Sequence, residues 1–247
     1  MGNNWLGWKV LEWLVRQDEE IVGLSIHPFQ AQKHAEEILS VADLPDEKVF
    51  DAETLSEERT QRQIRELNPD IGISILFDYI LKSSFLEIFS EEVVNLHPAY
   101  LPYNRGQYPN VWSIVEETPA GATLHYIDPE IDTGDIIARK NVEVEPIDTG
   151  RTLYEKLERA SLELFKETWP AISTGSVSRV EQIREEGTYH RTDHVDQIDE
   201  IDLETSYKAR DLINILRSRT FPPHEGAYFM EEGKKVYIRV NLEYGEE

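Results

Sequence analysis

Apolar runs of strand length alternate with charged segments of helical spacing through the first third of the chain, and this alternation restricts the fold more than any other feature. The run EEIVGLSIHP has the length of a strand, and DIGISILF is a continuous apolar run typical of a strand buried on both faces. Between them, TLSEERTQRQIREL predicts a helix, with Thr54 and Glu57 at the spacing of a capping box. The pattern predicts an α/β fold with a doubly wound, mostly parallel sheet, in which ligands bind at the carboxyl ends of strands.

The start of the chain departs from this pattern. Doubly wound domains usually begin with a strand that leads into the first glycine turn, whereas here the turn starts at Gly2 and helical spacing follows at once. We therefore expect that a central first strand is missing from the sequence as given. A natural reading frame without apolar codons upstream of Met1 would contradict this expectation.

Composition divides the rest of the chain. We expect a main domain over residues 1–175, closed by a long amphipathic helix whose first turn is capped by Thr152 and Glu155. Residues 176–203 are polar and predict a linker that passes over the surface. Residues 204–247 predict a small separate unit.

That C-terminal unit is expected to contain a helix that starts at Thr205 and a following β-hairpin. The second strand of the hairpin carries an apolar alternation of Val236, Ile238 and Val240. An exposed apolar strand can supply an interface between two copies of the chain, so the pattern favours a homodimer.

Charge and composition exclude several classes of function. The chain has 48 Asp and Glu against 25 Lys and Arg, a net charge of −23, and such a surface repels polyanions, so nucleic acid is not an expected partner. It has no cysteine, which excludes disulfides, thiolate metal sites and a cysteine nucleophile. No apolar segment approaches the roughly 20 residues that span a bilayer, and no leader is recognisable. We therefore expect a cytoplasmic protein with no membrane role.

Three polar residues suggest a reactive site. Asn95 and His97 lie in VVNLH, at the end of a predicted strand, and their side chains point the same way because side chains alternate along strands. Asp132 lies in the acidic loop DPEIDTGD. Amide and imidazole donors with a nearby carboxylate suit acyl transfer to an amine. Alone, Asn-X-His also fits a structural strand end, and Asp132 followed by Gly134 fits a turn, so both interpretations stay open at this point.

The ordered motifs NLHPAYLP, NRG with PNVW, TLHYID and IDTGDII resemble those of the folate-dependent formyltransferases. These enzymes use 10-formyltetrahydrofolate on glycinamide ribonucleotide, initiator methionyl-tRNA or nucleotide-linked amino sugars. The resemblance covers Gly2 to about Ile172 and implies a Rossmann-like catalytic domain. By position it implies that Asn95 and His97 stabilise the oxyanion during direct attack of the amine, and that Asp132 assists proton transfer.

The resemblance also implies the co-substrate 10-formyltetrahydrofolate, no metal, and two sets of contact residues. The residues implied to contact the folate are Phe77, Asp78, Tyr79, Ile80, Leu81, His125, Ile127 and Asp128. Those expected to contact the other substrate are Tyr103, Arg105, Gly106, Tyr108, Asn110, Arg219 and Phe221, with Lys82 and Arg217 as further cations for a diphosphate. A packed strand histidine is an equally good interpretation of His125.

The C-terminal segments narrow the choice of amine. GTYHR and RTFPPHEGAYF are similar to segments of the sugar N-formyltransferases, which act on nucleotide-linked 3-amino or 4-amino deoxysugars, for example a dTDP-4-amino-4,6-dideoxyhexose, in O-antigen and other polysaccharide biosynthesis. Glycinamide ribonucleotide and methionyl-tRNA are the alternative substrates, and the acidic charge argues against tRNA. A binding module of the same fold without turnover is a further alternative. The sequence leaves open which sugar, which nucleotide and which amine position apply.

Overall fold

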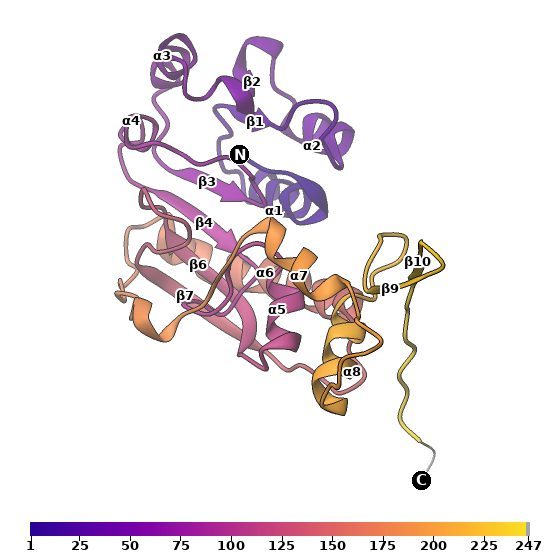
Figure 1. Ribbon diagram of the computed structural model, residues 1–247. Coiled ribbons are helices and arrows are strands. Elements are labelled where there is room, and N and C mark those ends of the chain that lie inside the picture. The colour runs from indigo at the N-terminus through magenta and orange to yellow at the C-terminus, as the bar shows by residue number, and fades with distance from the viewer. Residues whose placement is uncertain (246–247) are drawn as a thin grey trace. The chain divides into compact units, whose positions relative to one another are not determined.

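The structure is a computed structural model that describes residues 1–245 (Figure 1). The chain forms two compact units. The first comprises Met1–His97, Thr123–Arg139 and Ser161–Gln182, and the second comprises Pro98–Ala122, Lys140–Ala160 and Ile183–Glu247. Helix α6 (Gly150–Ile172) and strands β6 (Ala120–Tyr126) and β7 (Ile136–Val142) contribute residues to both units.

The first unit begins with alternating helices and strands, as the sequence predicted. Its elements are α1 (Asn4–Arg16), β1 (Leu24–Ile26), α2 (Ala35–Ala42), β2 (Val49–Asp51), α3 (Glu58–Glu66), β3 (Gly72–Ile75), α4 (Ser83–Leu86) and β4 (Val93–His97), with short 3-10 turns at Asp46–Lys48 and Ala52–Thr54. Figure 1 shows β3, β4, β6 and β7 side by side in one four-stranded sheet. Strand β4 runs parallel to β3 and antiparallel to β6. The predicted α/β, Rossmann-like class is confirmed.

Strands β1 and β2 form a separate parallel pair rather than joining this sheet. A cavity of about 750 Å³ lies between the pair and β3, and its lining includes Leu24 of β1 and Ile73 of β3. At one end of the cavity Gly2 forms a parallel bridge with Ile75. The strands of the first unit therefore form two separate sheets.

Two apolar clusters hold the first unit together. One gathers Phe50, Leu55, Ile64, Leu81, Phe85, Ile88 and Val93 from the strands and helices on either side of β3. The other packs Leu11 of α1 and Ile38 of α2 against Leu24 of β1. Burial of this many large apolar side chains favours a stable unit, since each contributes on the order of 2 kcal/mol.

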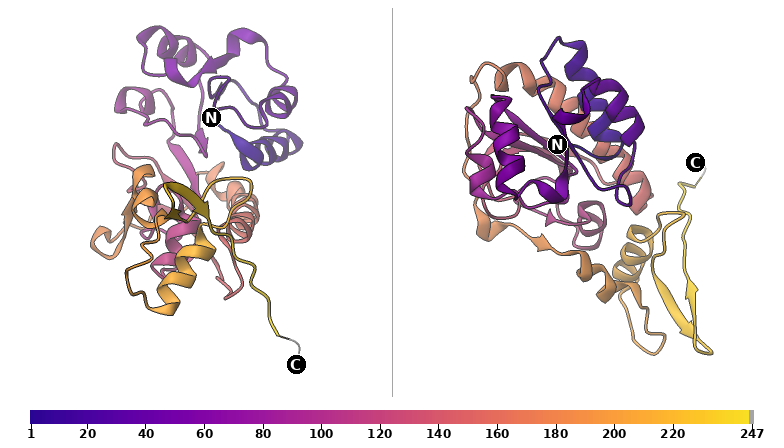
Figure 2. Two further views of the ribbon diagram at one scale, coloured as in Figure 1. Left: turned by 45° about the vertical axis from the view of Figure 1, so that its right-hand side comes forward. Right: turned by 90° about the horizontal axis from the view of Figure 1, so that it is seen from above.

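The second unit contains short elements that follow the loop after β4. They are β5 (Arg105–Gly106), α5 (Pro109–Val115), a 3-10 turn (Arg184–Glu186), β8 (Tyr189–His190), a second turn (Thr192–Val195), α7 (Asp196–Asp199), α8 (Ala209–Ser218), β9 (Tyr228–Glu231) and β10 (Lys234–Tyr237). Strands β9 and β10 form the antiparallel hairpin drawn in yellow in both views of Figure 2. No helix within residues 1–245 is long and apolar enough to cross a membrane.

The predicted helix caps are wrong in detail. The Thr54 hydroxyl donates to the carbonyl of Asp51, and α3 starts after Glu57 without a side-chain cap. At α6 the reciprocal pair is Thr149 with Thr152, three residues before the expected one. Thr54 bonds to a backbone carbonyl three residues before it, and Thr152 bonds to Thr149. Neither threonine therefore makes the contact that the capping-box spacing predicts.

The helix of the C-terminal unit also starts later than expected, at Ala209 instead of Thr205. The Thr205 hydroxyl donates to the Asp202 carboxylate in a turn before the helix, at 2.6 Å. The second hairpin strand, β10, ends at Tyr237, so it contains Val236 but not Ile238 or Val240.

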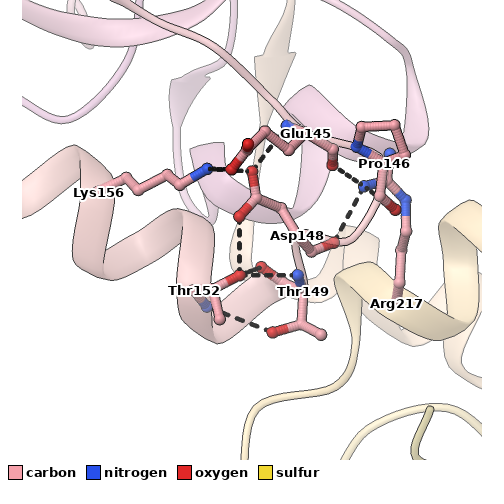
Figure 3. A network of polar contacts seen from close by, with 7 residues as sticks. All are labelled: Glu145, Pro146, Asp148, Thr149, Thr152, Lys156 and Arg217. Atoms are coloured by element: carbon pink, nitrogen blue, oxygen red, sulfur yellow. Dashed lines mark hydrogen bonds and ion pairs between the residues drawn. The ribbon is translucent and has the colours of Figure 1, made fainter. Parts of the chain in front are cut away.

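A buried polar network fixes the entry to α6 in the second unit (Figure 3). The Asp148 carboxylate accepts hydrogen bonds from the Thr152 hydroxyl at 3.0 Å, the Lys156 ammonium at 2.7 Å and the backbone N–H of Glu145 at 2.7 Å. The Arg217 guanidinium donates to the carbonyl oxygens of Glu145 and Asp148 at 3.0 and 2.9 Å. These contacts satisfy an otherwise costly buried charge and give Arg217 a structural role.

The buried amino terminus predicts a specific pH dependence of stability. Burial lowers the pKa of the Met1 amino group from 8.0 to about 6. The folded chain therefore binds fewer protons than the unfolded chain between these values, so the free energy of unfolding rises with pH across this window. We expect the Met1 amine to contribute about 3 kcal/mol to the change between pH below 6 and pH above 8, measured by urea denaturation.

The matched control is the same chain with an acetylated amino group, which cannot titrate. Its stability should be flatter across the same pH window, while all other titrating groups are common to both proteins. An equal pH dependence in the two proteins would show that the Met1 amine is not buried.

Candidate active site

Strand β4 delivers Asn95 and His97 to one side of the sheet at its carboxyl end. The residue between them, Leu96, is 1% exposed and belongs to the core. Asn95 stands opposite His125 of β6 in the antiparallel register. The strand predicted from VVNLH has the same bounds as β4, and the alternation of side chains places both polar residues as expected.

Asp132 completes this cluster from the loop between β6 and β7. Its carboxylate lies 3.3 Å from Asn95 Nδ2, 3.6 Å from His97 Nε2 and 3.5 Å from His125 Nε2. The Asp132 side chain is only 12% exposed. A buried carboxylate requires such partners, because transfer of an unpaired charge out of water is strongly unfavourable. The structure thus brings the three predicted residues together and adds His125.

His125 orients the Asn95 amide. Its Nδ1 lies 2.8 Å from the carbonyl oxygen of Tyr126, which can only accept, so this nitrogen carries a proton. In the neutral ring Nε2 then presents a lone pair, and it lies 3.1 Å from Asn95 Nδ2. The amide nitrogen therefore faces two acceptors, His125 and Asp132, which fixes its donor direction. His125 is 2% exposed in β6, so it is a packed strand histidine that also contacts Asn95 and Asp132.

Gln182 holds the loop that carries Asp132, and sequence reasoning missed it. Its side-chain Nε2 donates to the backbone oxygens of Asp132 at 3.0 Å and Gly134 at 2.6 Å. Asp132 has a positive φ of 54°, an uncommon conformation for a residue other than glycine. Gln182 lies in a polar stretch without recognisable motif, so no local signal identified it.

Gly134 is required by a close backbone approach. A Cβ atom at this position would lie 1.9 Å from the carbonyl oxygen of Tyr126, well inside the contact limit. The same backbone turn brings Asp135 O to accept from the N–H of Tyr126 at 2.9 Å. The glycine therefore lets the Asp132 loop fold back onto β6.

The segment implied to hold the folate packs on a buried histidine. His27, which follows β1, accepts a hydrogen bond at Nε2 from the N–H of Asp78 at 3.2 Å. Its ring contacts those of Phe77 and Tyr79 at centroid distances of 5.0 and 5.4 Å. His27 was not among the predicted site residues, although its position at the carboxyl end of a predicted strand was a usable signal.

The other residues in the implied folate set differ in exposure. Leu81 is part of the apolar cluster and Ile127 packs against it, whereas Ile80 is 71% exposed. The Asp128 carboxylate accepts from the Thr133 hydroxyl at 2.6 Å and so braces the loop next to Asp132. Among the residues that the structure describes there is no group of three or more His, Cys, Asp or Glu side chains arranged to hold a metal.

The candidate substrate residues, apart from Lys82, lie in the second unit. Arg105 and Gly106 form β5, which pairs in parallel with β8 at Tyr189 and His190. Gly106 has a φ of +86°, and a Cβ there would lie 2.2 Å from the His190 carbonyl oxygen. Tyr108 is 37% exposed. Together these residues form a tightly paired turn that carries two exposed aromatic rings, those of Tyr108 and Tyr189, the latter 40% exposed.

The remaining candidates have partners within the second unit. Arg219 forms a bidentate ion pair with Asp199, and the Asn110 amide donates to the Gly150 carbonyl at 2.8 Å. The Phe221 ring packs edge-on against Tyr154 at 5.5 Å, and the N–H of Tyr103 donates to Tyr100 O at 3.1 Å. Lys82, in the first unit, precedes α4 as an exposed N-cap. These contacts favour structural roles for Arg219 and Asn110.

Comparisons with known proteins identify two segments. Residues 9–168 match the family described as formyl transferase, and residues 194–244 match the N-formyltransferase dimerization C-terminal domain. The chain is 34% identical over 151 residues to a dTDP-4-amino-4,6-dideoxyglucose formyltransferase of Mycobacterium tuberculosis, which covers 61% of this chain and 64% of that protein. It is 29% identical to a methionyl-tRNA formyltransferase of Lactiplantibacillus plantarum, over 73% of this chain and 59% of that protein.

The chain therefore spans less than two thirds of the length of these curated relatives. Among solved structures it is similar to a 4-N formyltransferase from Francisella tularensis, with a TM-score of 0.80 and 28% identity. That similarity covers 95% of this chain and 94% of the other.

The role of Gly134 predicts a large effect of one added methyl group. Gly134→Ala should destabilise the protein by about 2–4 kcal/mol, because backbone must move to relieve the contact with Tyr126 O. Thermal denaturation measures the change as a loss of several degrees in Tm. Gly245→Ala is the matched control, since nothing lies within 4 Å of its added Cβ. Equal Tm values for the two variants would contradict the close approach.

Proposed function

Because the chain belongs to the formyl transferase family, we propose that it transfers a formyl group from 10-formyltetrahydrofolate to the amine of a nucleotide-linked amino deoxysugar. The observation that carries the proposal is the cluster of Asn95, His97 and Asp132 at the carboxyl end of β4. When an amine attacks a formyl carbon, the reaction requires hydrogen-bond donors for the oxyanion and a group that moves the amine proton. An amide, an imidazole and a carboxylate together supply these functions.

Asn95 and His97 supply the hydrogen-bond donors for the charge that develops on the formyl oxygen. Each well-placed donor contributes on the order of 3 to 4 kcal/mol of stabilisation in a site shielded from water. Asn95 Nδ2 lies 3.1 Å from His125 Nε2 and 3.3 Å from Asp132 Oδ1. We expect the longer bond, from Asn95 to Asp132, to break when Asn95 donates to the formyl oxygen of the substrate instead.

Asp132 acts through His97. Its carboxylate favours the protonated form of a neighbouring imidazole, since opposite charges within about 4 to 6 Å stabilise each other. At 3.6 Å the His97–Asp132 contact is an ion-pair distance, longer than a hydrogen bond. The attacking amine gives up one proton and the leaving folate nitrogen takes one, and this pair of side chains is placed to move them.

Gln182 and His27 are proposed as positioning residues for this reaction. Gln182 holds the backbone of the Asp132 loop, and His27 holds the segment around Asp78. Neither side chain is expected to touch the reacting atoms.

Several features support a sugar nucleotide as the acceptor. The C-terminal match at residues 194–244 is to a domain described for N-formyltransferases, and both the Mycobacterium tuberculosis and the Francisella tularensis relatives act on a 4-amino position by their names. We therefore propose a 4-amino deoxysugar. Arg105, Gly106 and Tyr108 are the proposed contacts, since Arg217 and Arg219 are held by partners of their own.

Methionyl-tRNA is the competing acceptor because a relative of that name matches at 29% identity. The net charge of −23 argues against a tRNA body, whose binding depends on cationic surface. We further propose a cytoplasmic homodimer assembled through the C-terminal segment, where Met230, Val236 and Tyr237 of the β9–β10 hairpin are each about two fifths exposed.

The proposal is tested by incubation of the purified protein with 10-formyltetrahydrofolate and a panel of amines. The panel contains dTDP-linked 4-amino and 3-amino deoxysugars, glycinamide ribonucleotide and charged initiator tRNA. Mass spectrometry should detect formamide formation on a nucleotide-linked sugar. Formylation of glycinamide ribonucleotide or tRNA alone would contradict the sugar assignment, and ligand binding without any transfer would favour a binding module.

Substitutions of the cluster predict large losses of turnover without loss of folding. His97→Asn and Asp132→Asn should each lower kcat by about 10²–10³-fold, since each removes a group that acts on the transition state. Steady-state kinetics measures the effect and circular dichroism checks the fold. His34→Asn is the control, because His34 lies outside the cluster with a φ of 57° that Asn tolerates. Turnover close to that of the control in either variant would remove that residue from its role.

A further inference from the structure

The proposed chemistry leaves one buried histidine of the second unit without a role. His190 of β8 is 6% exposed, and neither of its ring nitrogens has a hydrogen-bond partner among the residues that the structure describes. A buried polar atom without a partner lowers the stability of the fold, because it gives up its hydrogen bonds to water. A phenyl ring at this position would avoid that loss, so the histidine calls for a functional explanation.

The His190 ring packs against one side of helix α5. It stacks on the indole of Trp112, with ring centroids 4.0 Å apart and ring planes at 7°. Glu116, at the C-terminal cap of α5, follows Trp112 by four residues and so lies on the same side of the helix. Its Oε1 lies 3.2 Å from His190 Nε2, so Glu116 forms an ion pair with the ring when the ring is protonated.

The backbone of His190 holds the neighbouring strand β5. Gly106 of β5 stands opposite His190 in the parallel register, and the N–H of Gln107 donates to the His190 carbonyl oxygen at 2.9 Å. From β5 the chain runs through Tyr108, which has a positive φ of 56°, directly into α5. His190 therefore contacts both flanks of residues 105–108, with its backbone on the side of β5 and with its ring on the side of α5.

Protonation of His190 introduces a charge into this packing. Burial lowers the pKa of the His190 ring from its usual value of 6.5, the Glu116 carboxylate opposes this effect, and His194 adds to it. The His194 ring lies edge-on to His190, with centroids 5.9 Å apart. Because the pKa is lowered overall, the unfolded chain binds this proton more readily than the folded chain. The stability of the packing therefore falls as the pH decreases from 6.5 to the pKa of the folded protein.

We propose that His190 is a positioning residue for the acceptor, which holds residues 105–108 in place while its ring is neutral and loosens them when the ring gains a proton. The inference rests on the proposed function, since it takes Arg105, Gly106 and Tyr108 as the acceptor contacts. Binding of a nucleotide-linked sugar therefore weakens as the pH falls, and the effect lies in the affinity for the acceptor rather than in the transfer step.

Binding of acceptor analogues tests the proposal. Isothermal titration calorimetry measures the Kd of dTDP-glucose and of UDP-glucose for the 247-residue chain from about pH 7.5 to about pH 5.5. Neither ligand has an amine, and a diphosphate that is esterified at both ends does not titrate in this range. The Kd should rise by about threefold to tenfold as the pH falls, since one proton changes an equilibrium by at most about tenfold per pH unit.

Two variants separate the ring of His190 from other titrating groups. His190→Phe keeps a flat ring on Trp112 but cannot titrate, so it should bind within about threefold of the unsubstituted protein at the upper pH, with a Kd that changes by less than about twofold as the pH falls. Its Tm should not decrease, because the ring loses no hydrogen bond. His34→Asn is the matched control: His34 stacks on Trp8 in the first unit, and its removal should leave the pH dependence of Kd unchanged.

A second measurement needs no ligand. The ring signals of His190, identified by their loss in His190→Phe, should titrate in an NMR experiment with a midpoint below 6.5. Glu116→Gln removes the carboxylate that raises the pKa of His190, so the midpoint should move lower still. The pH at which the Kd rises should move with it.

Three results would overturn the proposal. One is a Kd that rises equally in the unsubstituted protein and in His190→Phe, or that stays constant in both. Another is loss of binding at the upper pH in a folded His190→Phe, which would mean that a ring nitrogen contacts the ligand. The third is a His190 midpoint at or above 6.5. Absence of binding of both nucleotide sugars to the unsubstituted protein would contradict the proposed function itself, and the role of His190 with it.

Discussion

The arrangement of the candidate site depends on the buried Asp132 carboxylate. Asn95, His97 and His125 reach it from two neighbouring strands, within 3.3 to 3.6 Å. A charge at this depth is stable only with partners, so the carboxylate fixes the directions of the Asn95 amide and the His97 imidazole, while the Tyr126 carbonyl fixes the His125 ring. The antiparallel pairing of β4 with β6 and the turn at Gly134 are what bring these groups to one point.

Much of the first unit could be predicted from the sequence because its elements have local signals. Continuous apolar runs identified the buried strands. The segment VVNLH predicted the bounds of β4 and the polar residues at its carboxyl end. Gln182 could not be predicted in this way, since its role depends on two carbonyl groups about 50 residues away in the chain. The capping box at Thr54 and the helix start at Thr205 were wrong for a related reason: the hydroxyls of both threonines bond to Asp51 and Asp202, three residues before them, and fixed spacing rules ignore such partners.

The two units divide the chemistry of the proposed reaction. The first unit holds the reactive cluster and the segment packed on His27, and the second holds the candidate substrate residues around β5 and β8. Three arginines were predicted to bind a diphosphate in the second unit. Arg217 and Arg219 make short contacts with carbonyls or an acidic residue, whereas Arg105 Nε donates to Thr188 O at the longer distance of 3.5 Å, so Arg105 is the strongest of these candidates. Specificity for the amine is therefore expected to depend on a small part of the second unit.

The most direct test of the central claim is a crystal structure of the protein with 5-formyltetrahydrofolate and a dTDP-linked 4-amino deoxysugar. The account predicts the formyl oxygen within about 3 Å of Asn95 Nδ2 and of a His97 ring nitrogen, with the sugar amine facing the formyl carbon. A formyl group bound away from these side chains, or an amine that cannot approach it, would contradict the assignment of this cluster as the site of transfer.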